Sequence, residues 1–423
     1  MIPAAGSPSF TIRARHVLPL AGPPIENGWI SVRRGRVVAI GRRAPAGKVC
    51  DLGDVIVVPG LVNSHTHLEF SDLDVPLDGA GGLPQWIERV VQLRRSRPVE
   101  ANAAPRVEAS IRRGLRESAA AGVTTIGEIA TSVVPAAYRH DGPRVRVYRE
   151  CLGLSPDAIT AALDGLDRDL DLLSSGGIPA GVSPHAPYSV AAALGRTVLD
   201  RARQRRLPAA MHLGESAAEA ELLSAGTGAF RTLLNDLGAW PTGSPPTLLS
   251  AADWISRLAR GPRGLVVHGT FLGTTRGDDS LARLARHRDG LCVAICPRTT
   301  RLLSGSLPPV ARFRDAGVRL AIGTDSRASN PDLSVLAECR ALVDASLCSP
   351  VEALRMATVD GAWALMLENR CGILAPGRAA DMAILRPGVP VRDPYAAALD
   401  PGTQVVTTLR AGRVIAGAEI GEG

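Results

Sequence analysis

The chain has 423 residues, of which 45% are hydrophobic and 21% are charged. That length is enough to bury a large core and is compatible with one large domain plus a smaller one. The first residues lack the basic start and sustained apolar run of a signal peptide, and no segment is apolar enough to span a bilayer. We therefore expect a soluble cytoplasmic protein without a membrane partner. The composition leaves the oligomeric state open, and a homo-oligomer is compatible with it.

The net charge of +7 does not indicate nucleic-acid binding, because arginines alternate with acidic residues and no basic run carries interleaved aromatics. The seven cysteines are scattered and contain no C-x-x-C pair, which argues against a disulfide framework and a zinc ribbon. Lys48 is the only lysine. A mechanism that needs a catalytic lysine in the body of the chain is therefore excluded.

Both chain ends have the pattern of short strands and turns. Apolar and polar residues alternate from about Thr11 to Val58, and the pattern R-x-G-R-V-I/V-A occurs at 34–39 and, less fully, at 410–416. We expect residues 1–58 and 372–423 to form one small β-sandwich domain around a separate body at 59–371.

Within this body, apolar runs suited to buried strands alternate with amphipathic helical stretches. Eight runs with intervening helices predict a (β/α)8 barrel. The runs are Val55–Val62, Val123–Ile129, Val145–Cys151, Ile178–Val182, Pro208–Met211, Gly264–Val267, Leu291–Ile295 and Val318–Ile322.

Five of the eight histidines and one aspartate follow these runs closely. They are His65, His67, His185, His212, His268 and Asp325, whereas His16, His140 and His287 fall elsewhere. Active sites of such barrels lie at the carboxyl ends of the strands. His65 and His67 are two residues apart, so both rings can face one point on an extended chain. The positions predict one shared site at this rim.

Several motifs resemble those of the metal-dependent amidohydrolase superfamily, in the branch of cytosine deaminase, adenosylhomocysteine deaminase and the chlorotriazine hydrolases. They are PGLVNSHTHLEF, HLGES, VVHGTFL, CPRTT, AIGTDSRASNPDLSVLAE and the closing segment Gly372–Asp381. The resemblance covers essentially the whole chain and implies the barrel and the β-sandwich. It is strongest to the aminofutalosine deaminases of menaquinone biosynthesis.

The resemblance implies a metal site of His65, His67, His212 and Asp325, with an open position for water or substrate. Such a centre lowers the pKa of bound water and makes hydroxide available. Zinc is the expected divalent ion, with iron or manganese as alternatives. One metal ion is favoured, because the chain has no lysine beyond Lys48 to bridge two.

Three residues are expected to take part in catalysis. In the resembling deaminases the glutamate of this motif carries protons between water, ring nitrogen and leaving amine, which implies this role for Glu215; a solvated carboxylate at a helix start is the alternative. His268 would polarise the attacking water, or else act as a fifth ligand in a two-metal site. Asp325 would accept the proton of the water.

Substrate contacts are less sharply indicated. His185 is expected to contact substrate, with a structural histidine as the alternative. Trp86 could stack on a heteroaromatic ring, and Arg298 could pair with a substrate carboxylate. Glu69 and Glu150 complete the set of pocket candidates.

The implied reaction is hydrolytic removal of the exocyclic amine of a purine-type heterocycle by metal-activated hydroxide. Its substrate would be a small heterocyclic amine, such as aminofutalosine or another adenine nucleoside. Adenosylhomocysteine or methylthioadenosine deamination is the nearest alternative, followed by guanine-, cytosine- or triazine-type hydrolysis. A non-catalytic barrel that serves as a scaffold is the alternative from a different class, and it predicts loss of the ligand residues, which are all present here.

Overall fold

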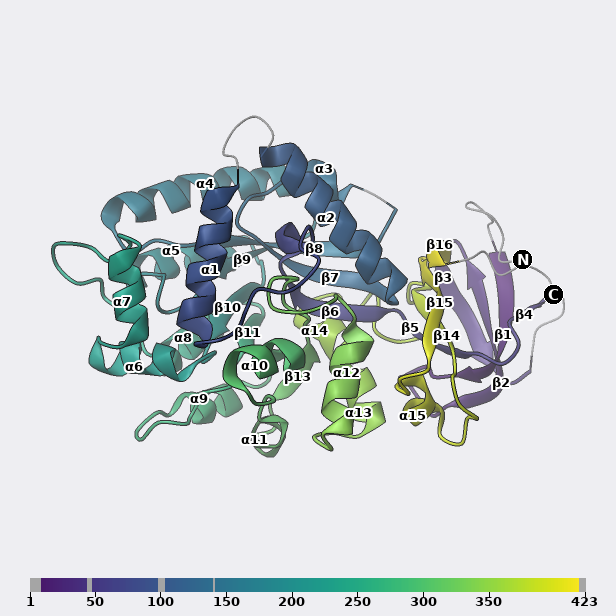
Figure 1. The fold of residues 1–423 in the computed structure, drawn as a ribbon. Coiled ribbons are helices and arrows are strands. Elements are labelled where there is room, and N and C mark those ends of the chain that lie inside the picture. Colours follow the sequence, from purple (N-terminus) through teal and green to yellow (C-terminus); the bar gives the residue numbers. More distant parts are fainter. Residues whose placement is uncertain (1–8, 44–47, 98–102, 140, 418–423) are drawn as a thin grey trace.

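The computed structural model describes residues 9–43, 48–97, 103–139 and 141–417. His140 and both outermost ends of the expected β-sandwich, 1–8 and 418–423, lie outside the described residues. The described chain contains two eight-stranded sheets. Figure 1 shows the larger one surrounded by helices and the smaller one to its right.

The larger sheet is a nearly closed parallel barrel, which confirms the predicted fold class. Its strands follow one another in chain order, and each pairs in parallel with the next. They are β6 (Leu61–Thr66), β7 (Val123–Ala130), β8 (Arg144–Cys151), β9 (Ala180–Pro184), β10 (Ala209–Leu213), β11 (Gly264–His268), β12 (Leu291–Ile295) and β13 (Arg319–Ile322).

Helices between these strands cover the outside of the barrel (Figure 1). Local sequence fixes several of their starts: Ser155 caps α4, and Ser349 with Glu352 forms a capping box on α13. The helices are α1 (Leu83–Ser96), α2 (Ala103–Ala120), α3 (Pro135–Tyr138), α4 (Pro156–Ser175), α5 (Ala192–Gln204), α6 (Ala217–Ala225), α7 (Ala229–Asp236), α8 (Ala251–Leu258), α9 (Ser280–Arg286), α10 (Pro297–Ser304), α11 (Val310–Asp315), α12 (Val335–Asp344), α13 (Pro350–Arg355), α14 (Gly361–Ala364) and α15 (Pro394–Ala398), with single turns η1 (Leu68–Phe70) and η2 (Met356–Asp360).

The smaller sheet combines strands from both chain ends, as the sequence predicts. Its strands are β1 (Ser9–Val17), β2 (Ile25–Arg33), β3 (Arg36–Gly41), β4 (Cys50–Asp51), β5 (Ile56–Pro59), β14 (Met382–Arg386), β15 (Gln404–Arg410) and β16 (Arg413–Gly417). Strand β5 pairs antiparallel with β14 and parallel with β1, so it joins the two ends in one mixed sheet. The sheet has its own core, which includes Ile30, Val57 and Ile384.

The predicted first barrel strand, Val55–Val62, is wrong in its extent. The apolar run is divided at Gly60: β5 before it belongs to the small sheet, and β6 after it begins the barrel. Both strands are fully buried, so apolar residues continue on each side of Gly60. The sequence pattern therefore does not show where one strand ends and the next begins. One consequence is that His65 lies inside a strand rather than after one. His212 and His268 also lie within their strands, β10 and β11.

The barrel is closed between its first strand and the segment that follows its last. The backbone N–H groups of Thr324 and Asp325 both donate to the carbonyl oxygen of His65, at 3.1 Å each. The Ser64 hydroxyl donates to the carbonyl oxygen of Ile322 at 2.6 Å. These bonds bring a histidine of β6 beside the aspartate that follows β13.

Among the described residues, no helix is both long and apolar enough to cross a membrane.

Gly60 is expected to be essential for the junction of the two sheets. A Cβ atom at this position would lie 2.3 Å from the buried side chain of Thr124. Since the surroundings are packed, Gly60→Ala should lower the free energy of unfolding by about 1–3 kcal/mol, measured by urea denaturation. Gly22→Ala is the matched control, because a Cβ there meets nothing within 4 Å. Equal stability of both variants would contradict the packing argument.

Candidate metal-dependent active site

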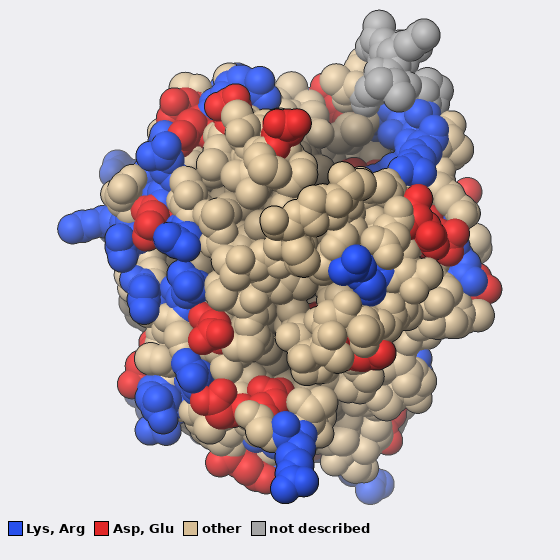
Figure 2. Space-filling model, turned by 90° about the vertical axis from the view of Figure 1, so that its left-hand side faces the viewer, with Lys and Arg blue, Asp and Glu red and all other residues tan. Residues whose placement is uncertain are grey.

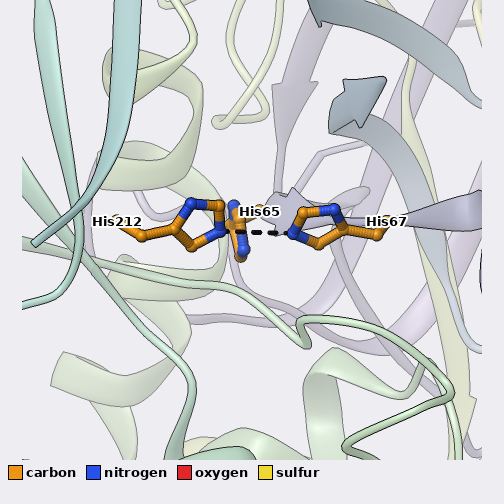
Figure 3. A group of neighbouring side chains, drawn as sticks. All are labelled: His65, His67 and His212. Atoms are coloured by element: carbon orange, nitrogen blue, oxygen red, sulfur yellow. Dashed lines mark hydrogen bonds between the residues drawn. The ribbon is translucent and has the colours of Figure 1, made fainter. Parts of the chain in front are cut away.

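Three histidines converge at the carboxyl ends of the barrel strands. His65 lies in β6, His67 follows it directly and His212 lies in β10. The Nε2 atoms of His67 and His212 are 3.2 Å apart, and the His65 ring centroid lies 5.0 Å from each of the other two. Figure 3 shows His67 and His212 facing each other with the His65 ring between them. One nitrogen from each ring lies within 4.8 Å of the others.

The hydrogen bonding of these rings fits a metal site. Among the described residues, both ring nitrogens of His65 and Nδ1 of His67 are buried without a hydrogen-bond partner, as expected where an ion or a water completes the site. Nδ1 of His212 lies 3.0 Å from the carbonyl oxygen of His185, so it carries the proton and leaves Nε2 free as a ligand. Burial lowers the pKa values of His67 and His212 well below the ordinary range, which keeps both rings neutral.

Asp325 supplies the carboxylate of this cluster. Its Oδ1 lies 3.5 Å from Nε2 of His65 and 3.7 Å from Nε2 of His67, while Oδ2 accepts a hydrogen bond from the Ser329 hydroxyl at 2.7 Å. Burial opposes ionisation, but the neighbouring His65 and His67 hold the pKa of Asp325 below its usual value. Its backbone has φ of 56°, an uncommon conformation for a non-glycine residue, and such strain often accompanies functional positions.

Glu215 and His268 form a second pair at the same rim. Nε2 of His268 lies 3.3 Å from Oε1 of Glu215, and both side chains are buried. The solvated carboxylate considered above for Glu215 therefore does not describe this side chain. Burial, with Asp325 and Glu219 nearby, raises the pKa of Glu215 well above its ordinary value. This environment favours the protonated form of the side chain.

The loop that carries Glu215 is fixed from behind by Glu219. Its carboxylate accepts hydrogen bonds from the backbone N–H groups of Gly214, at 2.8 Å, and Glu215, at 3.3 Å. Gly214 has φ of 65°, and a Cβ there would lie 2.7 Å from the side chain of Leu272. A glycine is therefore required at this turn.

These groups share one pocket with a largely apolar wall. Helix α1 supplies much of this wall through one face. The lining residues are His67, Phe70, Leu83, Trp86, Ile87, Val90, Val91, Arg94, Glu150, Leu152, His185, Tyr188, His212, Glu215, His268, Asp325 and Ser326. Of the predicted substrate contacts, Trp86, Glu150 and His185 line the pocket.

His185 is held by short local contacts. Its Nδ1 lies 2.6 Å from the Ser189 hydroxyl, which itself donates to the carbonyl oxygen of Ala186 at 3.2 Å. The hydrogen bond to Ser189 fixes the orientation of the ring and leaves Nε2 without a role in it. Burial lowers the pKa of His185 to about 3, so the ring is neutral.

Arg298 and Glu69 are not among the lining residues. The Arg298 guanidinium donates to Asp332, at 2.6 Å and 3.0 Å, and to Glu338, at 2.6 Å. The guanidinium N–H groups of Arg298 are thus already bonded to the carboxylates of Asp332 and Glu338. This geometry gives no support to the predicted contact with a substrate carboxylate. Glu69 instead accepts a hydrogen bond from Arg94 at 2.7 Å.

Sequence reasoning missed Arg94, Tyr188, Phe70 and Ser329. Arg94 had a detectable signal, because positions 86, 90 and 94 share one face of a helix. Tyr188 lies three residues after His185 in the motif SPHAPYSV. No sequence pattern pointed to Ser329 or Phe70, because their roles depend on contacts that form only when the loops fold.

The barrel and its histidine and carboxylate cluster define a class of hydrolase with a metal centre at the strand ends. The model of the Amidohydrolase family matches residues 56–415, and the chain belongs to this family. It is therefore a hydrolase acting on C–N bonds.

Relatives with similar sequences extend over most of the chain. The 5-methylthioadenosine/S-adenosylhomocysteine deaminase of Natronomonas pharaonis is 29% identical, over 90% of this chain and 81% of the relative. The enzyme of the same name from Moorella thermoacetica is also 29% identical, over 90% and 85%.

Solved structures with the same fold include two deaminases. Helicobacter pylori aminofutalosine deaminase in complex with methylthio-coformycin has a TM-score of 0.82 and 23% identity, covering 96% of this chain and all of its own. An adenosine deaminase from Xanthomonas campestris with bound zinc has a TM-score of 0.75 and 23% identity, covering 96% and 92%.

The histidine cluster predicts a metal content that depends on His65. Purified wild-type protein should contain a stoichiometric divalent metal, and His65→Ala should lose most of it, because the central imidazole between His67 and His212 is then missing. Elemental analysis by mass spectrometry measures both. His287→Ala is the control, since this residue lies at the carboxyl end of α9 and outside the pocket. Wild-type protein without stoichiometric metal would contradict the assignment.

The neutral state of His185 predicts a loss of stability in acid. The unfolded chain takes up a proton near pH 6.5, whereas the folded chain resists it until about pH 3, so stability falls as pH drops through this window. The contribution of His185 alone should lower the free energy of unfolding by about 1.4 kcal/mol between about pH 8 and about pH 5.5. Urea unfolding of wild type and His185→Asn at both pH values isolates the contribution. An identical pH dependence in the two proteins would refute it.

Proposed function

We propose that this protein is a metal-dependent deaminase that hydrolyses the exocyclic amine of adenine nucleosides. One observation carries the proposal: a buried carboxyl that can hold a proton, Glu215, shares a pocket with the histidine cluster and with an ionised Asp325. This combination provides separate groups for donating and accepting protons. Deaminases of 5-methylthioadenosine and S-adenosylhomocysteine among the relatives support adenine as the base.

A single zinc ion is the proposed cofactor, held by His65, His67, His212 and Asp325. When bound, it would act as a Lewis acid and make water a better nucleophile near neutral pH. Three imidazoles and a carboxylate suit zinc, and a structure of the same fold contains it. Iron and manganese accept the same ligands, so metal analysis decides between them.

We assign the proton transfers of this reaction to residues of the chain itself. Hydrolysis joins the oxygen of one water to the carbon that bears the amine, breaks the C–N bond and releases ammonia. Asp325, whose charged form is favoured by the neighbouring histidines, would accept a proton from the water. Glu215 would donate its proton to the ring nitrogen, take up the remaining proton of the added water oxygen and pass it to the leaving amine. The proton held by Asp325 would then return Glu215 to its protonated form. His268, 3.3 Å from Glu215, would orient the water with its neutral ring.

The remaining pocket suits a heteroaromatic base with an apolar extension. Trp86 is fixed by a hydrogen bond from Nε1 to the carbonyl oxygen of Ala328, at 3.1 Å, so its ring presents a rigid surface. Nε2 of His185 can form a hydrogen bond, and Tyr188 packs edge-on against that ring with centroids 5.6 Å apart. We propose aminofutalosine, an intermediate of menaquinone biosynthesis, as the first substrate to test, followed by adenosylhomocysteine and methylthioadenosine.

Ammonia release across a panel of nucleosides and bases tests the proposal. The panel contains aminofutalosine, adenosylhomocysteine, methylthioadenosine, adenosine, guanine and cytosine. We expect activity on at least one adenine nucleoside and little on the two free bases. Activity on guanine or cytosine alone would overturn the substrate assignment, and no activity on the panel would overturn the proposed deamination of adenine nucleosides.

Glu215→Gln provides the matched control for the chemistry. The amide has nearly the same shape but cannot exchange a proton, so kcat should fall by about 10²- to 10⁴-fold. Metal content should stay at the wild-type level, because Glu215 is not among the proposed ligands. Retention of more than about a tenth of wild-type kcat would remove Glu215 from the mechanism.

A further inference from the structure

Arg94 is the one lysine or arginine among the described residues that line the pocket. It lies in the last turn of α1, and the positions of this helix that precede it along the pocket wall are apolar. These positions are Leu83, Trp86, Ile87, Val90 and Val91. A ligand that lies along α1 therefore meets an apolar surface and then one positive charge.

Three contacts hold the guanidinium of Arg94 in place. One terminal nitrogen, Nη2, donates to Oε1 of Glu69 at 2.7 Å and to the hydroxyl of Thr131 at 3.3 Å. The guanidinium carbon also lies 5.2 Å from the centroid of the Phe70 ring, a cation–π contact. Its orientation is thus fixed before a ligand arrives, which lowers the entropy lost on binding.

Part of the guanidinium remains available. Within the described part of the chain, Nε and Nη1 of Arg94 donate no hydrogen bond, and 36% of the side chain is exposed. Glu69 itself is outside the pocket lining, whereas the buried Glu150 is the acid that lines the pocket on the same side as Arg94. The neighbouring Arg97, also beside Phe70, is instead bound to Asp72 at 2.7 Å.

We propose that Arg94 binds a carboxylate carried by the part of the substrate outside the reacting base. This inference rests on the proposed function and narrows its substrate class to adenine nucleosides with a carboxylate on the 5′ substituent. The open Nη1 donors of the guanidinium can form a charge-assisted hydrogen bond to a carboxylate. Glu69 neutralises part of the charge, which disfavours a phosphate dianion relative to a carboxylate.

The test compares substrates that differ in this group. Aminofutalosine and adenosylhomocysteine carry the carboxylate, whereas methylthioadenosine does not. In Arg94→Gln, kcat/KM for the first two should fall by about 10- to 100-fold, mainly through KM, because a charge-assisted hydrogen bond is lost. The value for methylthioadenosine should change by less than about threefold. Arg95→Gln, on the same helix but outside the pocket lining, should leave all values unchanged.

A second arm needs no substitution. Wild-type enzyme should prefer aminofutalosine to its carboxamide analogue by at least about tenfold, and Arg94→Gln should lose this preference. Adenosine 5′-monophosphate tests the alternative anion, and a higher kcat/KM for it than for the carboxylates would overturn the assignment.

The outcomes separate this inference from the proposed function. If wild type deaminates adenine nucleosides but Arg94→Gln slows all of them equally, Arg94 is merely a structural partner of Glu69 and the inference fails alone. It also fails alone if wild type prefers methylthioadenosine to both carboxylates. If wild type deaminates no adenine nucleoside, the proposed function fails and the carboxylate subsite fails with it.

Discussion

The site depends on the hydrogen bonds that the carbonyl oxygen of His65 accepts. This oxygen accepts hydrogen bonds from the backbone N–H groups of Thr324 and Asp325. These bonds join the first barrel strand, β6, to the segment that follows the last barrel strand, β13. The same contact fixes the distance between an imidazole of β6 and the Asp325 carboxylate. Because the imidazole nitrogens of His65 find no hydrogen-bond partner within the described chain, closure of the barrel leaves a cluster of lone pairs that an ion can satisfy.

Burial opposes the ionisation of both carboxyl groups at this rim, but their neighbours differ. Asp325 is surrounded by imidazoles that favour its charge, whereas Glu215 faces two other acids and therefore favours its proton. A base and an acid of the same functional group thus lie in one pocket near neutral pH. On the face in Figure 2, blue and red residues lie mainly around the margin, and most of the central area is uncharged.

The barrel and its histidines could be predicted because each depends on local sequence. A buried parallel strand is a run of apolar residues, and the polar residue that ends it lies at one rim whatever the rest of the fold does. The break at Gly60 could not be predicted in this way, since it depends on the tight approach of Thr124 from another strand. The partners of Arg298 could not be predicted for a similar reason, because Asp332 and Glu338 are 34 and 40 residues away in the sequence.

The groups proposed for chemistry and those proposed for selection come from different parts of the fold. Strands β6, β10 and β11 and the segment after β13 carry the reacting groups, and the pairing of the strands fixes their spacing. Helix α1 carries Trp86 and Arg94, which lie outside the barrel sheet. In Figure 1, α1 lies on the outside of the barrel, apart from the strands. A new residue on this helix is therefore expected to alter which nucleoside is admitted.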